Sequence, residues 1–208
     1  RNGKRLRPAL LIWTCGLFGG NTKKAKLPAT AIEIFHNWTL VHDDIIDDDD
    51  FRKGLPSTHR TIANFAEAGY DLSKREAEIF GRNNAILVGD IQHAWALDMI
   101  ARSPLGDGCR IDLIRELCSL GGRDLICGEC LDLGVSYNKW MLTSYEDLLK
   151  IAALKTAKLL EFCVYAGAKI AAEDNRISDT QLGKIIKFAN LAGIAFQIKD
   201  DWLGVFAD

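Results

Sequence analysis

The stretch that decides the fold is PATAIEIFHNWTLVHDDIIDDDDFRKG, residues 28–54, where an apolar run leads into six aspartates between positions 43 and 50. We predict a helix near 28–49. Residues three and four apart share one face of a helix, so Asp43, Asp44 and Asp47 form an acidic patch. These carboxylates repel one another, and the helix dipole disfavours negative charge at a C-terminal end. A compensating positive group is therefore expected.

Magnesium is the positive group that fits this patch best. It prefers carboxylate oxygens, keeps several waters and completes its shell with substrate phosphates. A calcium-binding EF-hand needs glycine at its sixth position and glutamate at its twelfth, and counting from Asp43 these positions hold Asp48 and Gly54. That loop is excluded. A solvated acidic helix end remains the alternative to a magnesium site that binds a diphosphate.

Cationic residues follow the aspartates at once. Arg52 offers a fork that matches phosphate oxygens and Lys53 a point charge, although both could also simply neutralise the neighbouring carboxylates. A second cationic group opens the chain, where GKRLRP places Lys4, Arg5 and Arg7 around the start of a helix at Pro8. A helix N-terminus with flanking cations is a favourable anion site.

Two further segments carry polar groups inside apolar helices. ALKTAKL contains Lys155 and Thr156, and a buried ammonium is costly unless it faces an anion. FQIKDDWLG contains Gln197, Asp200 and Asp201, with Gln197 and Asp200 on one helix face. Two aspartate-bearing helices and several separated cations together indicate a cavity for metal ions and two phosphorylated substrates.

The sequence as a whole predicts an all-α protein. Its 208 residues are 48% hydrophobic and 26% charged with a net charge of -2, which predicts one domain and argues against nucleic-acid binding. No apolar run is long enough to cross a membrane. We expect a single-domain bundle of long, mostly antiparallel helices around a central cavity, covering 1–208 and lacking its N-terminal and C-terminal portions. The expected helices lie near 8–18, 28–49, 60–69, 73–102, 109–135, 144–172 and 178–206.

Six cysteines are scattered through helical segments, which favours a reducing compartment and a cytoplasmic protein over a disulfide scaffold. Cys127 and Cys130 have the spacing of a zinc knuckle but lack a second pair of ligands at matching distance. We interpret them as small core residues of a helix.

Five segments occur in the order that is typical of one enzyme family: GKRLRP, EIFHNWTLVHDDIIDDDDFRKGLPSTH, ILVGDIQHAWA, KTAKL and GIAFQIKDDWLGVF. The chain resembles the trans-isoprenyl diphosphate (polyprenyl) synthases, of the farnesyl and geranylgeranyl diphosphate synthase kind. The resemblance implies head-to-tail condensation of isopentenyl diphosphate with an allylic diphosphate. It also implies several Mg²⁺ ions shared with the substrate diphosphate, and a homodimer.

The resemblance also implies a role for individual positions. Asp43, Asp47 and Asp200 would bind magnesium, with Asp44 in the same patch. Arg52 and Lys155 would contact the allylic diphosphate, and Thr156 and Gln197 would flank the allylic cation. The isopentenyl diphosphate pocket would consist of Lys4, Arg7, His36 and Lys53. The expected catalytic residues are Lys155, Asp43 and Asp47.

The chain departs from the family pattern at the second aspartate motif, where the usual third aspartate is Gly204. Glu129 stands where the family often has glutamine, and the basic stretch that follows the second motif in the family is absent from these residues. Gly204 therefore supports one alternative, a non-catalytic partner subunit. A terpene cyclase or a head-to-head condensing enzyme would lack the opening isopentenyl pocket.

The resemblance implies that a bulky residue upstream of the first aspartate motif can end the cavity, and Trp38, five residues before Asp43, is the candidate for limiting product length to C15–C20. A helical wheel places it about 140° from Asp43, so plain core packing is the competing interpretation. Trp38→Ala should lengthen the product if Trp38 ends the cavity. A longer-chain polyprenyl diphosphate synthase is the alternative for the product.

Overall fold

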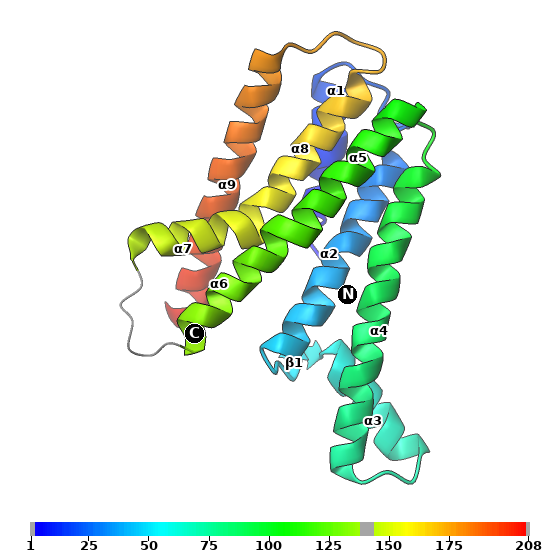
Figure 1. The fold of residues 1–208 in the computed structure, drawn as a ribbon, viewed down its shortest axis with the longest axis vertical. Coiled ribbons are helices and arrows are strands. Elements are labelled where there is room, and N and C mark those ends of the chain that lie inside the picture. The colour runs from blue at the N-terminus through cyan, green and yellow to red at the C-terminus, as the bar shows by residue number, and fades with distance from the viewer. Residues whose placement is uncertain (1–2, 138–143, 207–208) are drawn as a thin grey trace. The chain divides into compact units, whose positions relative to one another are not determined.

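The computed structural model describes residues 3–137 and 144–206, and this part of the chain is almost entirely helical (Figure 1). The elements are α1 (Leu6–Leu17), α2 (Lys26–Ile46), β1 (Phe51–Arg52), β2 (Leu55–Pro56), α3 (Thr58–Gly69), α4 (Lys74–Ala101), α5 (Asp107–Ser119), η1 (Leu120–Leu125), α6 (Ile126–Tyr137), α7 (Tyr145–Ala152), η2 (Ala153–Ala157), α8 (Lys158–Ala171) and α9 (Asp179–Phe206). The predicted all-α fold class is confirmed.

Most helix boundaries lie within a few residues of the predicted ones. The segments expected near 109–135 and 144–172 are each helical throughout, but each contains a π-helical turn, η1 and η2. A π-helical turn inserts an extra residue into an α-helix and is frequent at functional sites. Lys155 and Thr156 both lie in η2.

Contacts between residues divide the chain into two compact units. Unit 1 comprises Arg1–Ala29 and Ile100–Asp208, and unit 2 comprises Thr30–Met99. The expectation of one domain over 1–208 stays a prediction.

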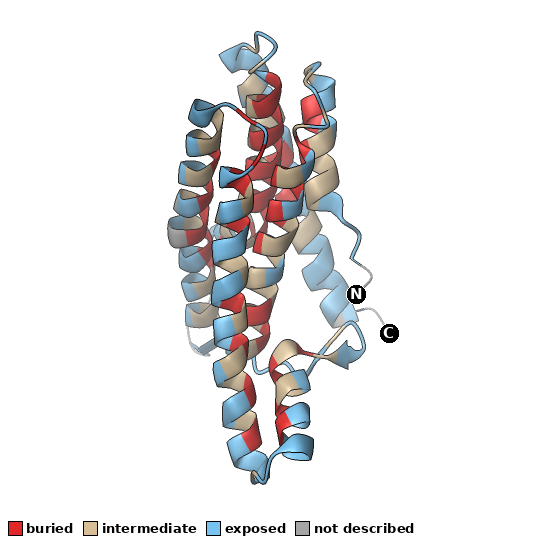
Figure 2. Cartoon of the chain, turned by 90° about the vertical axis from the view of Figure 1, so that its right-hand side faces the viewer, coloured by how far each residue is buried: buried red, intermediate tan, exposed pale blue. Residues whose placement is uncertain are grey.

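Unit 1 is built around α8, which packs against α1 and α9 (Figure 1). Most residues of α8 are apolar, and a helix of this kind is stable only when most of its surface is buried. It buries Leu159, Leu160, Phe162, Cys163, Val164, Ala166, Gly167, Ala168, Ile170 and Ala171. Figure 2 shows helices with buried residues on one side and exposed residues on the other, the usual pattern of amphipathic helices.

Unit 2 contains most of α2, the β1–β2 hairpin, α3 and most of α4. The hairpin pairs Phe51 with Pro56 and Arg52 with Leu55, leaving a two-residue turn at Lys53 and Gly54. Both turn residues have positive φ, as a type I′ hairpin turn requires. None of the described helices combines the length and the apolar character needed to cross a membrane.

Candidate active site

The acidic end of α2 is shorter than predicted. The helix ends at Ile46 rather than near residue 49, and Asp48 has a left-handed backbone with φ 57°. Repulsion between the carboxylates and the helix dipole both oppose further helical turns here. The amide of Asp47 still donates to the carbonyl of Asp43 at 2.9 Å, so Asp43 and Asp47 remain one helical turn apart.

Arg52 is brought back to this helix end by the hairpin. Its Nη2 lies 2.9 Å from Asp43 Oδ2, and its Nε donates to Asp44 Oδ1. Asp44 is 1% exposed. Burial raises the pKa of Asp44, while the hydrogen bond from Arg52 opposes that rise. The pKa of Arg52 itself is raised, because its bonds to both carboxylates outweigh its own burial.

Arg52 therefore pairs with two carboxylates of the acidic patch and offsets one of their two negative charges, the alternative that its sequence position left open. Two of its five N–H donors are engaged in these bonds, so a contact with diphosphate through the others stays a prediction. Lys53 is exposed at the tip of the hairpin.

Two candidate residues lie on α2 on the N-terminal side of the acidic patch. His36 is partly buried, with Nδ1 3.4 Å from Thr39 Oγ1. Trp38 packs on Phe35, with ring centroids 4.8 Å apart, and on His93 of α4 at 4.6 Å. Trp38 thus contributes to aromatic packing between two helices of unit 2, as its competing interpretation expected, and its effect on product length stays a prediction.

Lys155 is a partly buried cation of unit 1. From η2 its Nζ reaches Asp132 Oδ2 at 2.5 Å and Glu129 Oε2 at 2.9 Å, both on α6. Burial lowers the pKa of Lys155, but the hydrogen bonds and charges of the two carboxylates outweigh it and raise the pKa. The ammonium is therefore charged at neutral pH, and its burial is compensated by these carboxylates.

The predicted residues of α9 adjoin the same π-helical turn. Thr156 Oγ1 donates to Gln197 Oε1, and Gln197 Nε2 donates to Asp201 Oδ1 at 2.8 Å. Asp200 is exposed on α9. A side chain added at Gly204 would meet nothing within 4 Å, so the departure at this position leaves no packing defect.

The two candidate residues of the opening segment lie at α1. Lys4 is exposed just before the helix, with Nζ 5.8 Å from the ring centroid of Phe196 on α9. Arg7 lies in the first turn of α1 and is partly buried. The structure thus forms two charged groups of predicted residues, the acidic end of α2 in unit 2 and the surroundings of Lys155 in unit 1.

Sequence reasoning misses one contact of a candidate catalytic residue. Asp132 belongs to none of the motifs above, although Glu129 and Asp132 are three residues apart and share a face of α6. Two carboxylates at this spacing can bind one ammonium together, so the sequence could have predicted a lysine partner for them. The interpretation of Cys127 and Cys130 as core residues is wrong, because both are exposed.

The carboxylates of the acidic patch fit a magnesium ion that takes its remaining ligands from water and from substrate phosphates. Within the described residues, no group of three or more His, Cys, Asp or Glu side chains could hold a metal ion by itself. Asp43 and Asp47 supply hard oxygen atoms one turn apart. Such a set suits Mg²⁺, which commonly takes one or two carboxylates and draws its other ligands from water and substrate phosphates.

Comparison with known proteins identifies the family. The polyprenyl synthetase family model matches residues 1–208, and the chain belongs to that family. It is 35% identical to farnesyl diphosphate synthase of Escherichia coli over 99% of this chain and 63% of that protein. It is 32% identical to geranylgeranyl diphosphate synthase of Saccharolobus solfataricus over 99% of this chain and 55% of that protein.

The fold is likewise similar to solved structures of this family. Geranylgeranyl pyrophosphate synthase from Corynebacterium glutamicum, solved with isoprenyl diphosphate and magnesium, superposes with a TM-score of 0.87 at 29% identity, over 100% of this chain and 57% of that one. A farnesyl and geranylfarnesyl diphosphate synthase from Zymomonas mobilis gives a TM-score of 0.82 at 29% identity, over 98% of this chain and 67% of that one. The chain spans about half to two thirds of the length of its curated relatives.

Proposed function

We propose that the protein condenses isopentenyl diphosphate with an allylic diphosphate, head to tail and with magnesium, to give a trans-prenyl diphosphate of C15–C20. The observation that carries the proposal is the end of α2, where the single guanidinium of Arg52 bonds to Asp43 and Asp44 beside Asp47, so that negative charge remains for a metal ion. Relatives named as farnesyl and geranylgeranyl diphosphate synthases support it. So does the fold similarity to the Corynebacterium synthase, which was solved with both isoprenyl diphosphate and magnesium.

The roles follow from the chemistry of each group. Asp43, Asp47 and Asp200 would hold magnesium, which when bound draws negative charge from the leaving diphosphate. Lys155 is charged and partly buried, so it can add its own attraction to the allylic diphosphate.

The oxygen atoms of Thr156 and Gln197 are suited to face the positive charge that develops as the carbon–oxygen bond breaks. The double bond of isopentenyl diphosphate then attacks that carbon, and the proton lost from the adduct passes to the released diphosphate. The residues proposed to hold the diphosphates in line are Lys4, Arg7, His36, Arg52 and Lys53.

The test is turnover by the purified protein with Mg²⁺, isopentenyl diphosphate and allylic primers of five, ten and fifteen carbons, read by product chromatography. Asp47→Asn should lower kcat/KM on the order of a hundredfold, because it removes one group that stabilises the leaving diphosphate. Asp49→Asn removes the same charge nearby and serves as the matched control. The absence of elongated product with every primer would favour a non-catalytic partner subunit.

Product length is tested with Trp38→Ala in the same assay. If Trp38 ends the cavity, the wild type should stop at C15–C20 and the variant should extend further. Wild-type products well beyond C20 would instead identify a longer-chain synthase and leave Trp38 as a packing residue.

We also propose a homodimer located in the cytoplasm. Leu87, Ile91 and Trp95 follow one another at intervals of four on α4 and are all exposed, and an exposed apolar stripe of this kind favours self-association. Free thiols at all six cysteines are in keeping with a reducing compartment. Light scattering of the wild type and of Trp95→Glu tests the dimer, which the substitution should weaken.

A further inference from the structure

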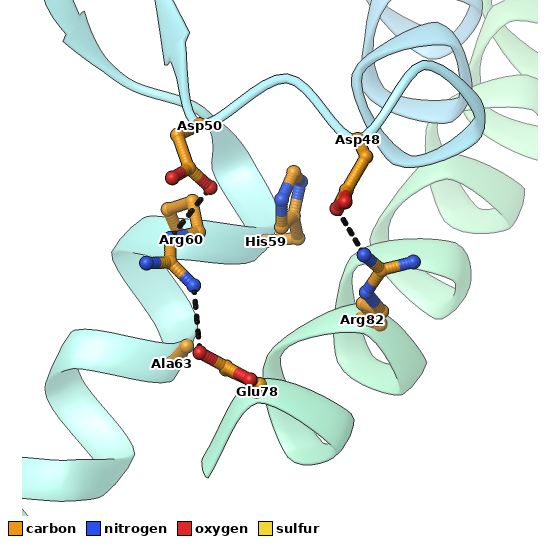
Figure 3. Close-up of a pocket in the computed structure, with 7 residues that line it drawn as sticks. All are labelled: Asp48, Asp50, His59, Arg60, Ala63, Glu78 and Arg82. Atoms are coloured by element: carbon orange, nitrogen blue, oxygen red, sulfur yellow. Dashed lines mark hydrogen bonds and ion pairs between the residues drawn. The ribbon is translucent and has the colours of Figure 1, made fainter. Parts of the chain in front are cut away.

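A cavity of about 230 Å³ lies beside the aspartates that follow α2, within unit 2. Figure 3 shows its lining, with His59 placed between two ion pairs that come from the turn after α2. None of its residues belongs to the set assigned to substrates or metal above. The lining residues are Asp48, Asp50, His59, Arg60, Ala63, Glu78 and Arg82.

The two ion pairs tie the turn to two different helices. Arg82 of α4 pairs with Asp48, and Arg60 of α3 places its Nε 2.8 Å from Asp50 Oδ1 (Figure 3). Arg60 also reaches Glu78 of α4, with Nη1 3.3 Å from Oε1. The turn is therefore held on both sides of Asp49.

The backbone of the turn needs such support. Asp48 has φ 57°, a conformation that non-glycine residues adopt at a cost and keep only when their surroundings impose it. The amide of Asp49 donates to the carbonyl of Asp44, and the amide of Ser57 donates to the carbonyl of Asp50, both at 2.9 Å. The amide of Asp47 donates to the carbonyl of Asp43, so a turn held in place directly after Asp47 supports the last turn of α2 against fraying.

The helices that carry the two arginines are themselves closely packed. A Cβ at Gly81 of α4 would lie 2.4 Å from the carbonyl oxygen of His59, so only glycine allows α4 this near to α3. His59 is 3% exposed, and its Nδ1 lies 3.2 Å from Ser57 Oγ. Burial lowers the pKa of His59, and the charge of Arg82 lowers it further, so the ring is neutral beside the ion pairs.

All five charged side chains of these pairs are between about a quarter and three quarters exposed, so the pairs add little to folding stability. Their geometrical effect is larger, because the two pairs hold Asp48 and Asp50, which directly follow the helical turn that carries Asp43 and Asp47. Groups that orient a metal ligand commonly change metal affinity about 10- to 100-fold when they are removed.

We propose that Arg60 and Arg82 are positioning residues, which hold the turn after α2 so that the Asp47 carboxylate lies beside that of Asp43 for metal binding. The inference rests on the proposed function for its catalytic meaning. Its physical content, the placement of Asp47 one helical turn from Asp43, is independent of turnover.

The experiment compares Arg60→Gln, Arg82→Gln and Arg82→Lys with Arg110→Gln, which removes a similar exposed arginine–aspartate pair in unit 1. Binding of Mn²⁺ is measured by equilibrium dialysis at a fixed concentration of inorganic pyrophosphate, which supplies the phosphate ligands that the patch lacks. The Mg²⁺ dependence of kcat is measured by turnover, and folding by thermal unfolding. We expect each glutamine variant of unit 2 to weaken Mn²⁺ binding about tenfold with nearly unchanged Tm. Arg82→Lys should recover part of the loss, and Arg110→Gln should match the wild type.

Equal Mn²⁺ binding by the wild type and both glutamine variants of unit 2 would overturn the inference, whether or not the wild type makes product. An inactive wild type whose variants still lose Mn²⁺ binding would overturn the proposed function alone. If Arg82→Gln does not fold, Asp48→Asn breaks the same pair from the other side. It must then weaken Mn²⁺ binding more than Asp49→Asn, which removes an equal charge; equal losses would refute the positioning role.

Discussion

Removing Arg52 should destabilise the protein by an amount set by one buried carboxylate. Arg52→Gln leaves Asp44, which is 1% exposed, without its charged partner. Leaving one member of a buried ion pair alone costs about 3 to 5 kcal/mol. The Arg52 side chain is 23% exposed, which admits some water, so we expect a loss near the lower end, about 3 kcal/mol.

The carboxylate can limit this cost by taking up a proton. At about 1.4 kcal/mol per pH unit, protonating a group of ordinary pKa about 3.9 at pH 7 costs about 4 kcal/mol, which is the ceiling for the effect. Burial already raises the pKa of Asp44 in the folded protein. A raised folded pKa means that stability is present below the unfolded value and falls as pH rises through the folded value.

In Arg52→Gln the pKa of Asp44 should rise further, so the difference between variant and wild type should shrink as the pH is lowered from 7 to 5. Urea unfolding followed by circular dichroism at both pH values measures this. Asp44→Asn combined with Arg52→Gln should recover much of the loss, because no lone charge is then buried. Arg110→Gln, an exposed pair, should cost less than about 1 kcal/mol. A pH-independent loss in Arg52→Gln, or none, would refute the reasoning.

Three further predictions concern unit 1 and the metal. Gly193→Ala would place a Cβ 2.4 Å from Ala157 Cα, so α9 must move from η2 at a cost of about 1 to 3 kcal/mol, measurable by urea unfolding; an unchanged midpoint would contradict it. Glu129→Gln should lower the pKa of Lys155, because one of the two carboxylate partners of Lys155 loses its charge. NMR titration of the ammonium measures this pKa, and an unchanged value would show that Asp132 alone raises it. Chelation by EDTA should abolish turnover yet leave the Tm within about 1 °C, because Arg52 already balances Asp44; a large drop in Tm would show a structural metal.

The helices were predictable because each follows from local pattern and local chemistry. Apolar spacing and the proline and glycine positions placed most boundaries within a few residues. The end of α2 at Ile46 could also have been predicted, because the helix dipole and the repulsion among the aspartates both disfavour a helix that extends to residue 49. The hairpin had a signal in Gly54, because glycine readily adopts the positive φ that a type I′ turn requires.

The choice of partners was not predictable, because it depends on tertiary packing. Lys155 was expected to contact the allylic diphosphate, and that contact stays a prediction. In the structure its ammonium pairs with Glu129 and Asp132, and the identity of these partners depends on how α6 lies against η2. Arg52 had two candidate roles, and only the folded hairpin shows that it reaches Asp43 and Asp44. The π-helical turns have no composition that distinguishes them from ordinary helix.

The turn η2 also determines the rotational phase between the helix before it and the helix after it. Each residue of an α-helix advances the side-chain direction by about 100°, so a single deletion within Ala153–Ala157 would swing Lys155 or the whole of α8 by that angle. Either outcome would turn the ammonium from α6 or the apolar residues of α8 from α1. The length of this short segment is therefore expected to tolerate substitution far better than it tolerates gain or loss of a residue.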